Sequence, residues 1–333
     1  IELSQGFYDR IVLPFFNSIG KISQRFTPQA TLQSTKRKLE MAGNPMQMDP
    51  AFLLAMRFVL AVVFGGLLFA VFAITGRNWL QGLEGGLDTA HSSFAHNNHL
   101  GDKTVLRQRD RSPKIDVERT DYGYSYVSTR DMGAEGSYVR VYQYILPAQQ
   151  MRANCMGWFG GKNEVPRQDG HLWVPIDDNT THVYNWLLAY DGTITLDPAW
   201  LEKREASMGR GANDLIPGTF RLKKNQSNDY LIDRQMQKTQ NFTGIAGVNT
   251  QDFALQEGMG PICDRSKEFL GTSDKAIVAM RRILLEAIAT NERGDTPRAL
   301  DPKTYRTVRA YDRVVPAGQD WKTVMQKDLV AIW

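Results

Sequence analysis

Cysteine and histidine are both scarce in this sequence. Its 333 residues include two cysteines, Cys155 and Cys263, and five histidines. Two cysteines allow at most one disulfide, which excludes the disulfide framework of a small secreted protein. We expect both to be small, buried apolar side chains. The few histidines narrow any imidazole-based site to five positions.

A strong excess of charge is also missing. The net charge is +4, from 40 basic and 36 acidic residues. Residues 1–77 carry eight basic and four acidic side chains, which accounts for the whole excess and leaves residues 78–333 neutral. A neutral domain has no electrostatic reason to bind nucleic acid, so we expect no nucleic-acid partner. The basic N-terminal excess instead indicates an anionic membrane surface.

Long apolar runs are absent except for one near the N-terminus. Phe58–Ile74 contains no charged or strongly polar residue, and with its upstream flank it exceeds the ~20 residues that cross a bilayer. We expect a transmembrane helix over residues 51–76, preceded by an amphipathic, helical juxtamembrane region over 1–50. The positive-inside rule then places the N-terminus in the cytoplasm and the rest of the chain on the far side.

Residues 78–333 have the pattern of an α+β domain. Between Ile115 and Leu196, alternating residues rich in β-branched and aromatic side chains predict several strands. A turn at Asp177–Asn179 predicts a hairpin. Asp274–Thr290 has apolar residues at helical spacing and predicts a long C-terminal helix. Strands followed by a long helix predict a helix-grip fold, in which an antiparallel sheet wraps around that helix.

Three of the histidines lie within nine residues, at His91, His96 and His99. The surrounding stretch, 79–100, reads as a helix interrupted by glycines. Residues five apart on an ideal helix point about 140° apart, so His91 and His96 can meet one metal only if the helix bulges or ends. Asp88, three residues before His91, can accept the outer ring N–H of a ligand histidine. The cluster indicates a metal site, with a polar loop as the alternative.

Residues 78–96 resemble the iron-ligand segment of the Rieske non-haem iron oxygenases, whose pattern is Asp-x2-His-x4-His. Further stretches resemble the same family in the same order, at 174–186, 228–237, 242–274 and 276–287. The likeness is greatest to the branch that contains phthalate 4,5-dioxygenase and the vanillate and phenoxybenzoate oxygenases. In that branch the catalytic subunits form rings of identical chains, which implies a homotrimer.

The resemblance implies a mononuclear Fe²⁺ ion held by His91, His96 and Asp252. It also implies that Asp88 is the bridge to the electron-donating cluster of an adjacent subunit. Glu257, five residues after Asp252, is a weaker rival for the third ligand.

Further implications concern the substrate and the partners. The family oxidises a small aromatic compound, here expected to be carboxylated, with O₂ in a mostly apolar pocket. We expect strands within 137–190 and the segment 200–256 to line that pocket, and a Rieske, ferredoxin or reductase component to supply electrons. The remaining histidines are expected to be structural or exposed; they are His99, His171 and His182.

The sequence departs from this family at its N-terminus. The [2Fe-2S] cluster expected in the family needs Cys-x-His and Cys-x2-His, and neither Cys155 nor Cys263 begins such a motif. Residues 36–63 instead resemble the membrane platform proteins of type II secretion and tight-adherence pili. We interpret the chain as a truncated gene fusion or an assembly chimera. The family implies a cytoplasmic location, whereas the predicted span would anchor this chain to a membrane.

Three functions remain open on this basis. The first is the catalytic portion of an aromatic-ring dioxygenase or monooxygenase, over residues 78–333. The second is an inactive domain of the same fold that binds an aromatic ligand. The third is a membrane component of a secretion or pilus assembly platform, for which the C-terminal domain is incidental.

Overall fold

The computed structural model describes residues 69–98, 100–102, 104–190 and 196–331, together with Gln33 and Lys36, which are helical. Contacts divide the chain into two compact units, 1–69 and 70–333. The predicted amphipathic region and most of the predicted span therefore lie outside the described residues. The second unit takes in residues 70–77, which the sequence analysis left outside the domain.

The second unit is built on an eight-stranded sheet. Seven strands follow the order β1-β7-β6-β5-β4-β3-β2, and β8 also pairs with β4. The strand bounds are β1 Phe69–Thr75, β2 Lys114–Arg119, β3 Gly123–Asp131, β4 Ser137–Ile145, β5 Gln149–Met156, β6 Lys162–Asp177, β7 Thr180–Ala189 and β8 Tyr311–Val315. The strand pairs β2·β3, β3·β4, β4·β5, β4·β8, β5·β6 and β6·β7 are all antiparallel, which confirms the predicted antiparallel sheet.

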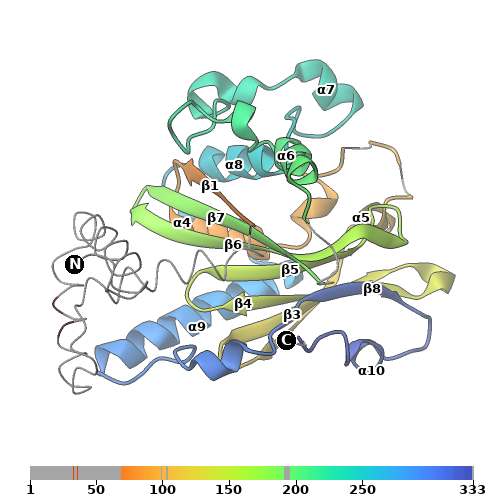
Figure 1. The fold of residues 1–333 in the computed structure, drawn as a ribbon, viewed down its shortest axis with the longest axis vertical. Coiled ribbons are helices and arrows are strands. Elements are labelled where there is room, and N and C mark those ends of the chain that lie inside the picture. The colour runs from red at the N-terminus through yellow and green to blue at the C-terminus, as the bar shows by residue number, and fades with distance from the viewer. Residues whose placement is uncertain are drawn as a thin grey trace, which may run out of the picture. The chain divides into compact units, whose positions relative to one another are not determined.

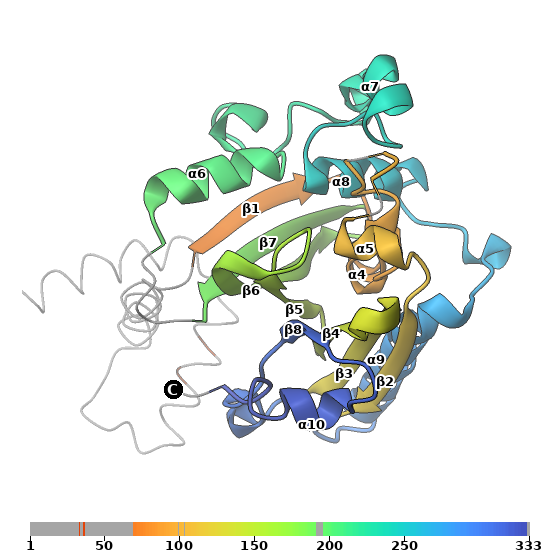
Figure 2. The same ribbon diagram turned by 90° about the vertical axis from the view of Figure 1, so that its right-hand side faces the viewer.

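Helices cover both ends of the sheet (Figure 1). The α-helices are α4 Trp79–Leu87, α5 Leu106–Arg109, α6 Pro198–Ser207, α7 Arg234–Thr239, α8 Val248–Gly258, α9 Lys275–Glu292 and α10 Trp321–Met325. The 3-10 helices are η5 His91–Ser93, η6 Gly133–Glu135, η7 Ala212–Asp214, η8 Gln226–Leu231, η9 Arg265–Lys267, η10 Thr272–Asp274 and η11 Pro302–Tyr305. Figure 2 shows β1 beside β7, with α6 and α8 over that end of the sheet.

The long C-terminal helix is confirmed as α9, which packs against β2 and β3. The main hydrophobic core joins Met280 of α9 to Leu83 and Leu87 of α4 and to tyrosines on β3 and β4. Those tyrosines form cross-strand pairs, since Tyr126 lies opposite Tyr142 with the ring centroids 4.7 Å apart. Such pairs stabilise a sheet. Because α4 contributes to this core, the end of α4 is held firmly where the histidine segment begins.

The hairpin predicted at Asp177–Asn179 is also confirmed. Strands β6 and β7 pair along their length and close at Asp177 and Thr180. Trp173 on β6 lies against α4, where a Cβ atom built on Gly82 or Gly86 would come within 2.6 Å of its ring. The glycines read as helix interruptions thus lie inside α4 and let it approach the sheet closely.

The predicted transmembrane helix is wrong over the part that the structure describes. Residues Phe69–Thr75 form strand β1 at the sheet edge beside β7. Their aromatic and β-branched side chains suit a strand, and pairing with β7 gives their backbone groups hydrogen-bond partners. Among the described residues, no helix combines the length and the apolar character needed to cross a membrane.

Candidate metal centre

The histidine segment begins where α4 ends. The sequence predicted a helix through residue 100, but α4 ends at Leu87, and His91 starts the short helix η5. Asp88 makes this turn because its Oδ1 accepts hydrogen bonds from the backbone N–H groups of Ala90 at 2.7 Å and His91 at 3.3 Å. Aspartate favours such local turns over helix continuation. Ending the helix removes the 140° separation that would keep His91 and His96 apart.

Asp88 also orients the His91 ring, through its backbone rather than its carboxylate. The His91 Nδ1 lies 2.5 Å from the Asp88 carbonyl oxygen and 3.8 Å from the Asp88 Oδ2. A carbonyl oxygen can only accept, so the Nδ1 of His91 donates and carries the proton. The Nε2 of His91 is then free to act as a ligand or acceptor.

His96 is held in the same way by a side chain from α8. Its Nδ1 lies 2.8 Å from the Gln251 Oε1. Both residues are buried, with Gln251 fully shielded from solvent. The Nδ1 of His96 therefore donates to Gln251, and its Nε2 faces the opposite direction.

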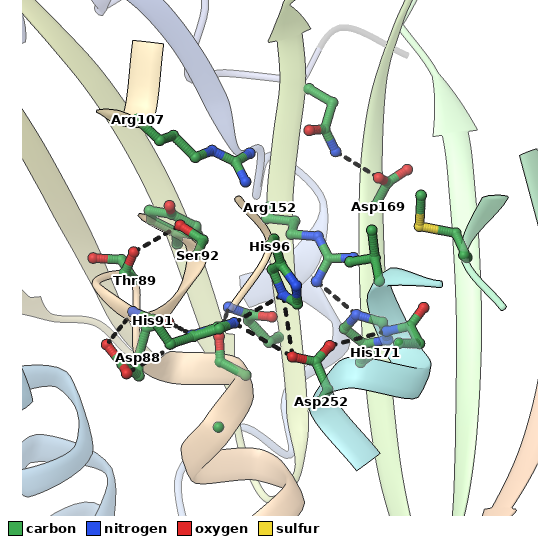
Figure 3. Close-up of a pocket in the computed structure, with 18 of the residues that line it drawn as sticks. Asp88, Thr89, His91, Ser92, His96, Arg107, Arg152, Asp169, His171 and Asp252 are labelled. Atoms are coloured by element: carbon green, nitrogen blue, oxygen red, sulfur yellow. Dashed lines mark hydrogen bonds and ion pairs between the residues drawn. The ribbon is translucent and has the colours of Figure 1, made fainter. Parts of the chain in front are cut away.

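The three residues expected to hold a metal come together in space (Figure 3). The His91 Nε2 and the His96 Nε2 are 3.1 Å apart. The Asp252 Oδ1 lies 3.5 Å from the first and 3.1 Å from the second. These three residues form a group whose ligand atoms all lie within 4.8 Å of one another. The three side chains that the sequence singled out thus lie together, and their role as metal ligands stays a prediction.

The three side chains bring electron-rich atoms close together, which is unfavourable without a positive charge between them. With both Nδ1 atoms protonated, the two Nε2 atoms and a carboxylate oxygen turn lone pairs toward one point. Burial raises the pKa of Asp252, but His96 and His91 outweigh burial and hold that pKa well below its ordinary value. Burial lowers the pKa of His91, but the Asp252 carboxylate, with Asp88, leaves it raised. Both directions show that the group favours a positive charge at its centre.

Glu257, the rival ligand, lies outside this group. Its Oε1 accepts a hydrogen bond from the Gly76 backbone N–H at 2.8 Å, and its Oε2 accepts one from the Tyr230 hydroxyl. It is buried, and its charge faces that of Arg77. Glu257 therefore has a structural environment of its own.

A cavity of about 160 Å³ adjoins the His–His–Asp group. Residues of β4, β5, β6 and β7 and of α6 and α8 line it, within the segments that the sequence predicted. The lining of this cavity is not mostly apolar, because six arginines contribute to it: Arg77, Arg107, Arg140, Arg152, Arg167 and Arg204. Three of them lie on β4, β5 and β6, one each lies on α5 and α6, and Arg77 lies between β1 and α4. A second cavity beside His91, lined by Phe94, Ile232, Phe242 and Ile245 among others, has the apolar lining that the sequence predicted.

Two of these arginines are neutralised by Asp169. Arg167 Nε and Arg204 Nη2 each lie 3.1 Å from that carboxylate. No described carboxylate forms an ion pair with the other four, which are Arg77, Arg107, Arg140 and Arg152. The lining contains three aspartates, Asp88, Asp169 and Asp252, against these six arginines. Positive charge is therefore in excess around the cavity.

Arg152 is the arginine held beside the His–His–Asp group (Figure 3). Its Nη1 lies 2.6 Å from the His171 Nε2, and the His171 Nδ1 lies 2.5 Å from the Asn185 Oδ1. Burial, with Arg152 and Arg210 nearby, lowers the pKa of His171 well below its ordinary value, so His171 is a neutral acceptor. Burial also lowers the pKa of Arg152 to about 10. His171 is thus structural, as expected, but within the cavity wall.

Arg107 and Arg140 form a second cationic part of the same wall. Arg107 lies over the Trp158 ring at 5.2 Å, and Arg140 donates to the Ala153 carbonyl at 2.9 Å. Burial raises the pKa of Tyr142, but Arg140, with Arg130 and Arg107, outweighs burial and leaves it lowered. The direction of this shift follows from the positive charges of the arginines around Tyr142.

The remaining predictions for single residues have mixed outcomes. His182 is half-buried against Tyr184 and Phe220, which agrees with a structural role. His99 lies outside the described residues. Both cysteines are free; Cys155 is buried as expected, and Cys263 is half-buried.

Gln251 and the six arginines of the cavity were not predicted from the sequence. Gln251 stands next to Asp252, so its position beside a proposed ligand was a usable signal. The arginines come from three strands, two helices and a connecting segment, and no local motif connects them.

Comparisons with known proteins identify a family and several relatives of this chain. The family model of the LigXa C-terminal domain like family matches residues 70–331. The oxygenase subunit of phthalate 4,5-dioxygenase from Pseudomonas putida is 31% identical over 269 residues, covering 75% of this chain and 57% of that protein. The oxygenase subunit of 3-chlorobenzoate-3,4-dioxygenase from Comamonas testosteroni is 28% identical over 273 residues, covering 75% of this chain and 60% of that protein.

Solved structures give a weaker likeness. Pseudomonas putida CBB5 NdmA with caffeine matches with a TM-score of 0.42 and 12% identity, over 68% of this chain and 54% of that chain. This likeness is too distant to support an inference. The chain spans less than two thirds of the length of the two curated relatives above. The family match covers most of the chain, however, and the chain belongs to the LigXa C-terminal domain like family, with oxygenase subunits among its relatives.

Proposed function

We propose that this chain supplies the catalytic portion of an oxygenase that oxidises a carboxylated aromatic compound with O₂ at a mononuclear Fe²⁺ ion. His91, His96 and Asp252 would hold the iron. One observation carries the proposal: two Nε2 atoms and a carboxylate oxygen face one another at 3.1–3.5 Å, while both Nδ1 protons are directed elsewhere. Such a group is stabilised by a cation.

The donor set fits ferrous iron. Two imidazoles and one carboxylate on one side of a metal are the ligands of non-haem iron oxygenases, and they leave positions for other molecules. Bound iron would supply the activation of O₂. The protein's part is to hold the ligands and to orient the aromatic compound in the adjoining cavity. The named relatives, which are oxygenase subunits, support the same activity.

The arginines that line the cavity support a carboxylated substrate. Arg152 is buried and lies beside the proposed metal ligands, and among the described residues its side chain bonds to the neutral His171. A carboxylate in the cavity would give Arg152 an ion-pair partner and could accept paired N–H groups from its guanidinium. Two relatives act, by name, on phthalate and 3-chlorobenzoate, which are both aromatic carboxylates.

Asp88 is proposed as the residue that connects this centre to an electron donor. Its carbonyl oxygen bonds to His91, and its side chain is 28% exposed, so one residue touches both a proposed ligand and the surface. The electron-donating component would be a separate Rieske, ferredoxin or reductase protein, which would dock beside Asp88 on a homotrimer of this chain.

Metal analysis and turnover of the purified full-length chain test this proposal. After anaerobic loading with Fe²⁺ and desalting, we expect about one iron per chain, and we expect Asp252→Asn to retain far less. With hydrogen peroxide and benzoate or phthalate, the loaded protein should form hydroxylated product. Iron bound without product would favour the inactive ligand-binding domain, and an absence of bound iron would contradict the proposal.

A further inference from the structure

Gln251 is the only described side chain that bonds to the outer nitrogen of His96. It lies on α8 immediately before Asp252 and is fully buried. Its Oε1 lies 2.8 Å from the His96 Nδ1, and its Nε2 donates to the Ile245 carbonyl at 2.9 Å and to the Asn98 Oδ1 at 3.2 Å. All the hydrogen-bonding groups of this amide therefore point at defined partners.

The Ile245 carbonyl fixes which way the amide faces. A carbonyl oxygen only accepts, so the Gln251 NH₂ group must face it, and the Oε1 must face His96. The Asn98 Oδ1 adds to this, since it also accepts from the Asn241 Nδ2 at 3.3 Å. A flipped Gln251 would turn its oxygen toward an acceptor. The main chain at Ile245 thereby determines that His96 is protonated on Nδ1.

The loop that presents Ile245 is itself held in place. The Asn241 Oδ1 accepts from the Gly244 N–H at 2.7 Å and from the Thr243 hydroxyl at 3.0 Å. Asn241 is buried. Gly244 and Gly247 have φ values of 66° and 100°, which suit glycine. The acceptor that orients Gln251 is thus part of a defined turn between α7 and α8.

We propose that Gln251 is a positioning residue for the metal centre, which directs the unprotonated Nε2 of His96 toward the metal. This inference rests on the proposed metal centre. His91 obtains the same orientation from the Asp88 backbone, which no substitution removes. Gln251 is therefore the described side chain that orients a ligand histidine and that mutation can delete, and it shares its helix with the third ligand.

The expected effect is on metal affinity. Residues that hold the outer nitrogen of a ligand histidine typically contribute 10–100-fold to metal binding. Without the Oε1 acceptor, His96 can rotate or move its proton to Nε2, which then cannot bind a cation. We expect Gln251→Met to weaken Zn²⁺ and Co²⁺ binding by that factor in a chelator competition with the full-length chain.

Two variants separate the acceptor from the rest of the side chain. Gln251→Glu keeps an oxygen toward His96, but its second oxygen faces the Ile245 carbonyl and the Asn98 Oδ1 in place of the NH₂ donor, so we expect it to bind Zn²⁺ more tightly than Gln251→Met. Gln143→Met is the matched control, because Gln143 is a buried glutamine on β4 whose amide donates to the Arg309 carbonyl at 2.9 Å, outside the cavity lining. Its Zn²⁺ affinity should stay within about twofold of the wild type, far below the 10–100-fold loss of an orienting residue.

Long-range ¹H–¹⁵N spectra of the Zn²⁺-loaded wild type report the same feature without mutation. We expect His96 to be protonated on Nδ1. A proton on Nε2, equal affinity in Gln251→Met, or a Gln251→Glu variant as weak as Gln251→Met would each overturn the role of Gln251. A wild-type chain that binds no metal would instead overturn the proposed centre itself.

Discussion

The two walls of the cavity differ in charge and in origin. One wall comes from the end of α4 and from α8, and it presents His91, His96 and Asp252. The other comes from strands β4, β5 and β6 and presents Arg140, Arg152 and Arg167. The first wall is suited to bind a cation and the second to bind an anion. A molecule with an acidic group can thus be held from the sheet side while its ring faces the proposed metal.

This comparison predicts that the two walls can be disabled separately. His96→Ala removes one of the proposed ligands, and we expect Fe²⁺ and Zn²⁺ affinity to fall by more than about 100-fold, because two ligands rarely hold a metal that needs three. Benzoate binding to the metal-free chain should change little. Isothermal titration with Zn²⁺ and with benzoate measures both; an equal loss in the two titrations would contradict the separation of the walls.

The reverse experiment replaces Arg152 by Met. Removing one partner of a buried, hydrogen-bonded charge pair costs about 2–4 kcal/mol, which corresponds to a 30- to 1000-fold weaker binding of benzoate. Benzamide, which has no charge, should lose much less, and Zn²⁺ affinity should stay unchanged. Arg119→Met is the control, because Arg119 is an exposed arginine that pairs with Glu286 on the surface. Equal losses for benzoate and benzamide would show that Arg152 acts through packing.

The cavity wall that presents His91, His96 and Asp252 was largely predictable from the sequence. His91 and His96 lie on one short segment with Asp88, and their spacing required the helix to end or bulge. The structure ends it at Leu87, because the Asp88 side chain bonds to the following backbone N–H groups. Asp252 was found through family resemblance alone, since nothing local connects it to the histidines.

The opposite wall, which presents Arg140, Arg152 and Arg167, was not predictable, because strand register determines which side chains face the cavity. Arg152 on β5 lies opposite Asp169 on β6, and Gln150 lies opposite His171. A shift of one residue would turn each of these side chains to the other face of the sheet. An irregularity between Asn154 and Met156 changes the register of β5 and β6 before these two strands meet at their turn. Alternation in one strand does not reveal its pairing with the next.

Strand β1 also could not be predicted from local sequence. Its apolar residues fitted a membrane helix as well as a buried strand, because apolar content alone does not distinguish the two. The partner strand, β7, settles the matter for Phe69–Thr75, since its hydrogen bonds are available only in the folded sheet.

Glu257 offers a smaller test of the contrast between ligands and structural carboxylates. Glu257→Gln leaves one oxygen to accept from both Gly76 and Tyr230 and removes the charge that faces Arg77. We expect the free energy of unfolding to fall by about 1–3 kcal/mol, as for an unsatisfied buried group. Zn²⁺ affinity should stay unchanged. Denaturant unfolding and chelator competition check the two parts, and lost metal affinity would reinstate Glu257 as a ligand.

The smallest expected effect is the pH dependence of stability that His171 causes on β6. His171 has a pKa well below its ordinary value, because burial and the charges of Arg152 and Arg210 disfavour its protonated form, while Asp252 opposes them. The unfolded chain binds a proton near pH 6.5, whereas the folded chain does not. Stability from this residue is therefore complete above about pH 6.5 and is lost as the pH falls, with a slope of at most ~1.4 kcal/mol per pH unit.

His171→Gln should remove that slope, because glutamine can still accept from Arg152 but does not titrate. The measurement compares the free energy of unfolding of the two metal-free proteins at several pH values between 5 and 8. Their difference should be constant above about pH 6.5 and should shrink below it, since only the wild type loses stability there. A difference that stays flat would mean that His171 binds a proton as readily in the folded state as in the unfolded chain. Arg152 would then face a cation, and this wall of the cavity could not hold its guanidinium toward an anion in the way that its hydrogen bond to His171 indicates.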